Sequence, residues 1–64
     1  MNKVRVYREA AGLTQLQLAR QVEVARQTIN LIENGKCNPS LDLCIRLAKA
    51  LGTDLNRLFW EDDA

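Results

Sequence analysis

Residues 14–36 read TQLQLARQVEVARQTINLIENGK, and this stretch decides the fold. Helix-forming residues fill its two halves, and only residues 23–25 interrupt them. Thr14 is a suitable N-cap for the first half, and Gly35 is the residue type that ends a helix. Two helices of about two turns each, joined by a short break, make a helix-turn-helix arrangement.

The second of these helices has an apolar side and a polar side. Ile29 and Ile32 share the side that would face the core. In the first helix, Ala19 is small enough to let the two helices cross closely, and Val24 would hold the turn against the core. Arg and Gln side chains can each make two hydrogen bonds to a base edge of DNA, and Leu can contact a thymine methyl group. We therefore expect the residues on the polar side to read bases: Arg26, Gln27, Asn30 and Leu31.

The rest of the chain also reads as short helices, because no long stretch alternates as a strand would. The expected helices are Lys3 to Ala11, Thr14 to Val22, Arg26 to Asn34, Leu41 to Leu51 and Leu55 to Phe59. The further candidate N-caps are Asn2, Ser40 and, for the last helix, Asp54 or Thr53. In the fourth helix, the expected inward residues are Leu41, Cys44, Leu47, Ala48 and Leu51. The fold class is therefore all-α, with five helices.

Composition limits what the chain can do. Its 64 residues, 47% of them hydrophobic, suffice for a single domain spanning 1–64, with 60–64 as an acidic tail. No apolar run approaches the roughly 18 residues of a membrane span. The chain has no histidine, and its two cysteines do not complete a zinc site. We therefore expect no enzyme activity, no metal, no cofactor and no membrane partner.

Charge is unevenly distributed, although the net charge is only +1. Residues 1–36 contain six basic and three acidic side chains, whereas residues 37–64 contain three basic and five acidic ones. The first part is therefore the one suited to a polyanion. A solvated mixed surface could carry the same imbalance, so charge alone does not decide the function.

The chain closely resembles the Cro/phage-repressor (XRE) helix-turn-helix family over about residues 2–60. The matching segments are Gly12 to Gln15, Leu18-Ala19, Val24 to Ile29, Ile32 to Lys36 and Asn38 to Leu41, continued by residues 48–52 and 55–59. The resemblance implies a five-helix, repressor-like DNA-binding domain whose third helix lies in the major groove.

The resemblance also implies roles for single residues. Arg26, Gln27 and Leu31 match positions that reach base edges, whereas Asn30 matches a position nearer the sugar-phosphate backbone. Arg8 and Glu33 match a structural ion pair between the first and third helices. The residues that match phosphate-contacting positions are Thr14, Gln15, Thr28, Asn34, Lys36 and Asn38.

Two residues depart from the family pattern around the turn. Glu23 stands where relatives often have a glycine in a left-handed conformation, which costs a non-glycine residue about 1–2 kcal/mol. Ala25 replaces the usual Ser or Thr cap of the third helix, a loss of roughly 1 kcal/mol. Both departures leave the motif in place.

The last third of the chain has more apolar side chains than one small core needs. A self-complementary patch for a homodimer is expected to contain Leu43, Leu55, Phe59 and Trp60. The alternative is that Trp60 folds back over the core of its own copy. Cys44 is expected in the core, and Cys37 is interpreted as an inert loop thiol, with redox sensing as its functional alternative.

These observations predict a cytoplasmic, sequence-specific DNA-binding transcriptional regulator. We expect it to act as a repressor or autoregulator and to bind near-palindromic double-stranded DNA as a homodimer. The alternative is an antitoxin or accessory subunit that acts mainly through a protein partner.

Overall fold

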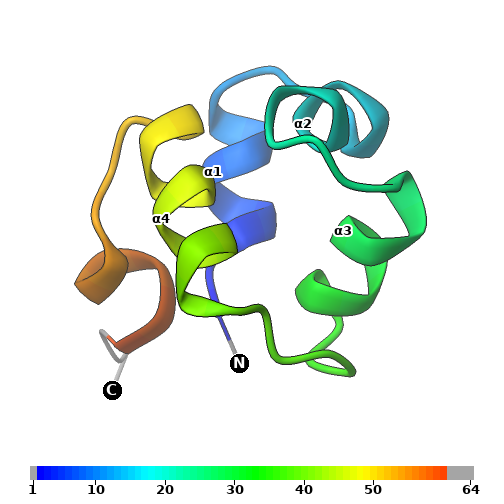
Figure 1. The fold of residues 1–64 in the computed structure, drawn as a ribbon. Coiled ribbons are helices and arrows are strands. Elements are labelled where there is room, and N and C mark those ends of the chain that lie inside the picture. Colours follow the sequence, from blue (N-terminus) through cyan, green and yellow to red (C-terminus); the bar gives the residue numbers. More distant parts are fainter. Residues whose placement is uncertain (1, 61–64) are drawn as a thin grey trace.

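The computed structural model describes residues 2–60, and every regular element in that range is helical (Figure 1). The elements are α1 (Val4–Ala10), α2 (Gln15–Gln21), α3 (Arg26–Glu33), α4 (Leu41–Ala50) and η1 (Asn56–Trp60). The expected all-α fold with a helix-turn-helix in its second and third helices is confirmed. Residues 61–64 of the predicted acidic tail lie outside the described residues.

Helix α1 runs through the middle of the fold, between the α2–α3 pair and the pair formed by α4 and η1 (Figure 1). The segment before α1 joins the two sides. Asn2 Nδ2 donates to the carbonyl of Ile32 in α3 at 2.8 Å, and the Lys3 amide donates to the carbonyl of Leu58 in η1 at 2.8 Å. The first residues of the chain therefore fix α3 relative to the end of the fold.

The predicted caps explain why the helices begin where they do. Thr14 Oγ1 accepts from the Gln17 amide at 3.1 Å, and Gln17 Oε1 accepts from the Thr14 amide at 2.8 Å, which forms a capping box. Ser40 caps α4 through the Leu43 amide at 3.2 Å. For the last element, Asp54 is the cap, since its Oδ1 accepts from the Arg57 amide at 2.8 Å.

The N-cap of α1 is Lys3, one residue later than predicted. Asn2 still satisfies part of this helix end, because its Oδ1 accepts from the Val4 amide at 3.1 Å. A side chain one position outside the cap can reach an unpaired amide of the first turn, so sequence alone does not separate the two positions.

One apolar cluster holds the elements together. Its fully buried members come from the five elements and from the C-cap of α2, namely Val4, Leu18, Val22, Ile29, Ile32, Leu47 and Leu58. Ala19 is 1% exposed, as its role at the helix crossing requires, and Val24 packs against the cluster from the turn. The α2–α3 pair is thereby fixed to the body of the domain.

The inner face of α4 differs from the prediction at its edges. Leu41, expected in the core, is 66% exposed, whereas Leu43, expected on the outer patch, is only 7% exposed. Ala48 follows Leu41 by seven residues on the same face of α4 and is only 6% exposed, so this face is covered further along the helix but not at its first turn. Cys44 is half-buried, with its Sγ 3.8 Å from the Pro39 carbonyl, and burial raises the pKa of its thiol.

The last element is a π-helical turn over Asn56–Trp60, not an α-helix over 55–59 as expected. Helical turns with this wider hydrogen-bond spacing occur mostly as single turns. A single turn contains too few side chains for an apolar pattern to distinguish the two spacings. Leu58 is the residue of this turn that enters the core, at 1% exposure, and Phe59 is half-buried.

Candidate nucleic-acid interface

Helix α3 presents a polar face to solvent and buries the opposite face. Ile29 and Ile32 are fully buried, as the sequence predicts. Arg26 and Gln27, at the first two positions of the helix, are exposed. The other predicted contact residues on α3 are half-buried and lie at its edges, namely Thr28, Asn30 and Leu31. The exposed end of α3 is therefore its N-terminal turn.

The turn before α3 keeps the left-handed backbone conformation of the family pattern, although Glu23 replaces the usual glycine. Glu23 adopts φ 60°, the only positive φ of a non-glycine residue in the described range. The Val24 amide donates to the Ala19 carbonyl at 3.0 Å, which closes the turn onto α2. Ala25 is the N-cap of α3 and provides no side-chain hydrogen bond. The start of α3 is thus positioned by backbone contacts and by Val24 packing.

A buried carboxylate lies behind this face. The Glu33 side chain is fully buried, and the structure places its predicted partner Arg8 against it, with Nε 2.6 Å from Oε2 and Nη2 3.2 Å from Oε1. Arg8 also donates through Nη1 to the Leu13 carbonyl at 2.8 Å. One guanidinium therefore joins α1, the segment before α2, and α3.

Two further donors to Glu33 were not predicted from the sequence. Arg5 Nε donates to Oε1 at 3.3 Å, and Gln15 Nε2 donates to the same oxygen at 3.1 Å. Arg5 precedes Arg8 by one helical turn, so the shared face of α1 was an available signal. No sequence signal links Gln15 to Glu33, because their contact depends on how α2 crosses α3.

These donors keep Glu33 ionised despite its burial. Desolvation by itself would raise the pKa of this carboxyl group, but hydrogen bonds from Arg8, Gln15 and Arg5 outweigh it and hold the pKa below its usual range. The hydrogen bond to Glu33 in turn raises the pKa of Arg8. A charged, fully hydrogen-bonded carboxylate is the arrangement that makes burial of an ion tolerable.

Gln15 extends this network to the surface. Its Oε1 accepts from Arg26 Nη1 at 3.2 Å while its Nε2 donates to Glu33. Gln15 was predicted to contact a DNA phosphate, and here both of its polar side-chain atoms have partners within the protein. The structure therefore brings together two predicted contact residues and connects them to the buried charge.

The remaining predicted phosphate contacts lie around the same face. Thr14 accepts a hydrogen bond in its capping box, but its hydroxyl keeps its own hydrogen to donate. Asn34 caps the end of α3, with Nδ2 donating to the Asn30 carbonyl at 2.8 Å. Lys36 and Asn38 are exposed in the following loop, and the Lys36 amide donates to the Leu31 carbonyl at 2.9 Å.

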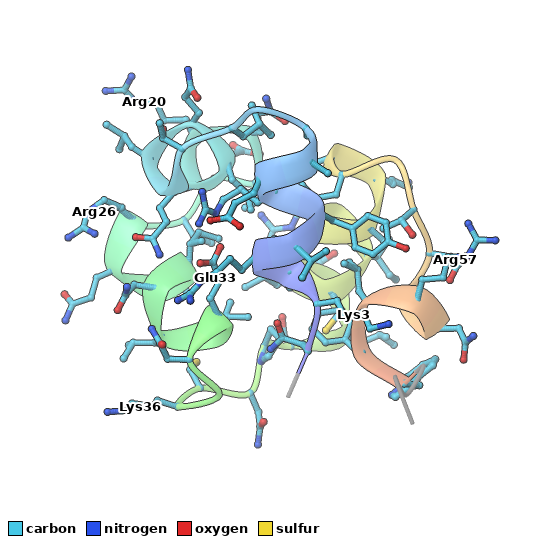
Figure 2. All side chains as sticks on the ribbon, turned by 180° about the vertical axis from the view of Figure 1, so that it is seen from behind. Lys3, Arg20, Arg26, Glu33, Lys36 and Arg57 are labelled. Carbon is cyan, nitrogen blue, oxygen red and sulfur yellow. The ribbon has the colours of Figure 1, made fainter. Side chains whose placement is uncertain are left out.

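The distribution of basic residues gives the molecule two distinct edges. Figure 2 shows Arg20, Arg26 and Lys36 along one edge and Arg57 at the opposite edge. Arg20 was not among the predicted contact residues, although it lies in the more basic part of the sequence. The edge with the three cations comes from α2, α3 and the loop after α3, so it is the side suited to a polyanion.

The four residues predicted to form a dimer interface differ in how much of each side chain is exposed at the surface. Leu55 and Phe59 are half-buried against the core, and Trp60 is 68% exposed. Leu43 is a core residue and has almost no surface to offer a second copy. The prediction that Leu43 belongs to an exposed dimer patch is therefore wrong, because Leu43 packs into the core of its own chain.

Other kinds of site have less support in residues 2–60. No group of three or more potential metal-ligating side chains occurs there, and Cys37 and Cys44 are both free thiols. None of the helices in this range has the length and apolar character needed to cross a membrane.

Comparisons with known proteins agree with this geometry. The family model described as Helix-turn-helix matches residues 4–58. The chain is 46% identical over 63 residues to an uncharacterized HTH-type transcriptional regulator of Methanocaldococcus jannaschii, covering 97% of this chain and 96% of that protein. It is 49% identical over 51 residues to a similarly named protein of Methanothermobacter thermautotrophicus, covering 80% and 74%. For the HTH-type regulator YgzD of Bacillus subtilis, the identity is 37% over 62 residues, covering 97% and 94%.

Proposed function

Because this chain belongs to the Cro/phage-repressor (XRE) family of helix-turn-helix transcription regulators, we propose that it is a sequence-specific repressor or autoregulator. In this proposal α3 enters the major groove of a near-palindromic site in double-stranded DNA. The observation that carries it is the position of Arg26, which is exposed at the start of α3 and hydrogen-bonded to Gln15. Regulation by DNA binding requires no catalysis.

The first turn of α3 reads bases in this proposal. Recognition helices of this motif contact base edges with their N-terminal residues, which is where Arg26 and Gln27 lie. Arg26 suits a guanine and Gln27 an adenine, since each can form two hydrogen bonds in the major groove. Asn30 and Leu31, about one turn further along α3, have less exposed surface and would contact the groove only when α3 is fully inserted.

The residues around α3 hold the DNA backbone. Lys36 and Asn38 lie in the loop after α3, and Thr14 lies at the start of α2, so phosphates on both sides of the groove have donors. Thr28 and Asn34 would add contacts from α3 and its C-cap. Gln15 is a positioning residue for Arg26 in the free protein, and a phosphate contact by Gln15 requires one of its present bonds to open.

Two copies on one site would supply the specificity that a single small domain lacks. Half-sites about 34 Å apart present the same groove to each copy of a symmetric dimer. The exposed Trp60 supports a protein contact of this kind, and it also suits the alternative of an antitoxin or accessory subunit. We place the protein in the cytoplasm, where such a DNA site would be accessible.

A footprint on the DNA upstream of its own gene tests this function. We expect protection of a near-palindrome that Arg26→Ala weakens, by the about 1–3 kcal/mol expected for the loss of one base contact. Arg57→Ala should preserve the protection, because Arg57 lies at the opposite edge (Figure 2). Both substitutions remove one exposed positive charge, so they are matched. Co-purification with an unrelated protein, combined with no protected site, would favour the antitoxin or accessory-subunit alternative.

A further inference from the structure

Two arginines of α1 share the buried carboxylate of Glu33, but only one of them reaches the surface. Arg8 contacts both carboxylate oxygens, with Nε at 2.6 Å and Nη2 at 3.2 Å, and its side chain is 11% exposed. Arg5 contacts Glu33 through Nε at 3.3 Å, and its side chain is 50% exposed. Arg8 therefore has the geometry of a structural partner, whereas the outer part of the Arg5 guanidinium is open to solvent.

The charges of this cluster do not cancel. Glu33 carries one negative charge and is paired with two guanidinium groups, so one positive charge remains. Arg8 is enclosed by its bonds to Glu33 and to the Leu13 carbonyl. The surplus positive charge therefore lies at the exposed member, Arg5, where it attracts anions.

Arg5 meets α3 at the C-terminal end of that helix. Its Nη2 donates a long, exposed hydrogen bond of 3.5 Å to Oδ1 of Asn34, the C-cap residue of α3. Asn34 and Lys36, which follows in the loop, are both exposed and both belong to the proposed phosphate contacts. Arg5 therefore brings a cation from α1 to the surface where those two residues lie.

We propose that Arg5 is a further phosphate contact of the DNA interface, held in place by Glu33 and acting beside Asn34 and Lys36. This contact rests on the proposed function and adds a residue of α1 to the DNA-binding surface. A guanidinium binds phosphate oxygens through paired N–H donors. Nη1 and Nη2 form such a pair at the end of the Arg5 side chain, beyond the Nε that Glu33 holds.

The two bonds of Arg5 have different parts in this contact. The bond to the buried Glu33 restricts the side chain before DNA arrives, so less conformational freedom is lost on binding. The bond to Asn34 is the one that opens, because it is long and its acceptor is a neutral amide oxygen. A phosphate oxygen carries charge and is the stronger acceptor for a guanidinium.

Titration of a random-sequence DNA duplex at several salt concentrations tests this contact without the cognate site. A phosphate contact reads no base, so it forms on any duplex. We expect Arg5→Gln to reduce the slope of log K against log salt by about one unit for each bound copy. Binding at low salt should weaken several-fold.

Arg57→Gln is the matched control for the removal of one exposed charge. The Arg57 side chain is 61% exposed, also pairs with one carboxylate, that of Asp54 at 3.7 Å, and lies at the opposite edge from Lys36 (Figure 2). We expect Arg57→Gln to leave the slope unchanged. Arg5→Lys keeps the charge but not the paired donors, so it should restore the slope and only part of the affinity.

Two measurements separate a DNA contact from a role in the fold. Urea unfolding should show that Arg5→Gln stays folded, because Arg8 and Gln15 still donate to Glu33. In the wild-type protein, saturating duplex should protect Arg5 from the arginine reagent phenylglyoxal and leave Arg57 reactive, as peptide mass spectrometry would detect. This second measurement needs no variant.

Three outcomes would overturn the proposal. An Arg5→Gln variant that keeps the wild-type slope, with Arg5 equally reactive to phenylglyoxal with and without DNA, assigns Arg5 to the fold alone and leaves the proposed function standing. An equal loss of slope in Arg57→Gln makes the effect one of net charge. A wild-type chain that binds no duplex at low salt removes the proposed function itself, and this contact with it.

Discussion

Arg26, at the exposed start of α3, donates a 3.2 Å hydrogen bond to Gln15, at the first position of α2. Because Gln15 also donates to the buried Glu33, the guanidinium that we assign to base reading is connected to the most buried charge of residues 2–60. Helix α2 therefore restricts the orientation of a side chain on α3, in addition to packing against that helix. A restricted donor loses less conformational freedom on binding than a free one does.

Replacement of Gln15 by methionine, which has a similar length and no hydrogen-bonding amide, should weaken binding to the cognate site about tenfold. Binding to random DNA should change less, since the loss acts through the orientation of Arg26. Gln21→Met, at the exposed end of α2, is the matched control. Titration of both variants with cognate and random duplexes measures the effect, and an equal loss on the two duplexes would show that Gln15 contacts phosphate only.

Arg26→Ala should reduce the sequence specificity of DNA binding, whereas Lys36→Ala should reduce the affinity for all DNA sequences. Arg26→Ala is expected to cost about 1–3 kcal/mol on the cognate site and to relax the preference at one base pair. Lys36→Ala should weaken binding to all sequences alike and reduce the salt dependence by about one unit per half-site. Binding isotherms at several salt concentrations distinguish the two. If Arg26→Ala instead behaves as Lys36→Ala does, Arg26 is a phosphate contact.

Glu33→Gln should change how stability depends on pH. The folded protein holds the pKa of Glu33 below the ordinary value of 4.5, so its contribution is complete above that value and is lost as the pH falls through the lower folded pKa. At pH 7 we expect Glu33→Gln to reduce the free energy of unfolding by about 1–3 kcal/mol, because Arg8 keeps only a neutral acceptor. Below pH 4 the difference between wild type and variant should shrink.

Urea unfolding of both proteins between pH 3 and pH 7 measures this difference, with Glu9→Gln as the control for an exposed carboxylate of the same type. A constant difference across the whole pH range would contradict the lowered pKa of Glu33. Loss of DNA binding without loss of stability would contradict its structural role.

Glu23→Gly should stabilise the protein. Glu23 has φ 60°, and a left-handed backbone costs a residue with a Cβ about 1–2 kcal/mol more than it costs glycine. Glycine loses about 0.5–1 kcal/mol through the greater freedom of its unfolded chain, so the net gain should be several tenths of a kcal/mol to about 1 kcal/mol. Thermal melts check this gain, and Glu23→Ala, which removes the charge but keeps the Cβ, should not reproduce it.

Local rules predicted most of this fold. The capping residues Thr14, Ser40 and Asp54 occupy the positions that the sequence indicates, because a cap depends on a few neighbouring residues. The buried stripe of α3 and the left-handed Glu23 followed from spacing and from the family resemblance in the same way. These features need no knowledge of how distant helices pack.

Features that depend on helix crossings were not predicted. The Gln15–Glu33 contact is one, and Arg46, whose Nη1 donates to the Val22 carbonyl at the end of α2 at 2.6 Å, is another. The exposure of Leu41 and the burial of Leu43 have the same origin, since periodicity indicates an apolar stripe but not which parts of α4 the neighbouring elements cover. Tertiary packing supplies this information.

Helix α3 begins with the exposed Arg26 and Gln27 and ends with the buried Glu33, and this difference in burial separates the residues that can vary from those that cannot. In the proposed function, a change at Arg26 or Gln27 would alter which bases are recognised without removing a core side chain, whereas a change at Glu33 leaves Arg8 without its charged partner. New operator preferences could therefore evolve, or be engineered, by exchanging the outer residues of α3 alone. The same domain could serve many promoters with an unchanged interior.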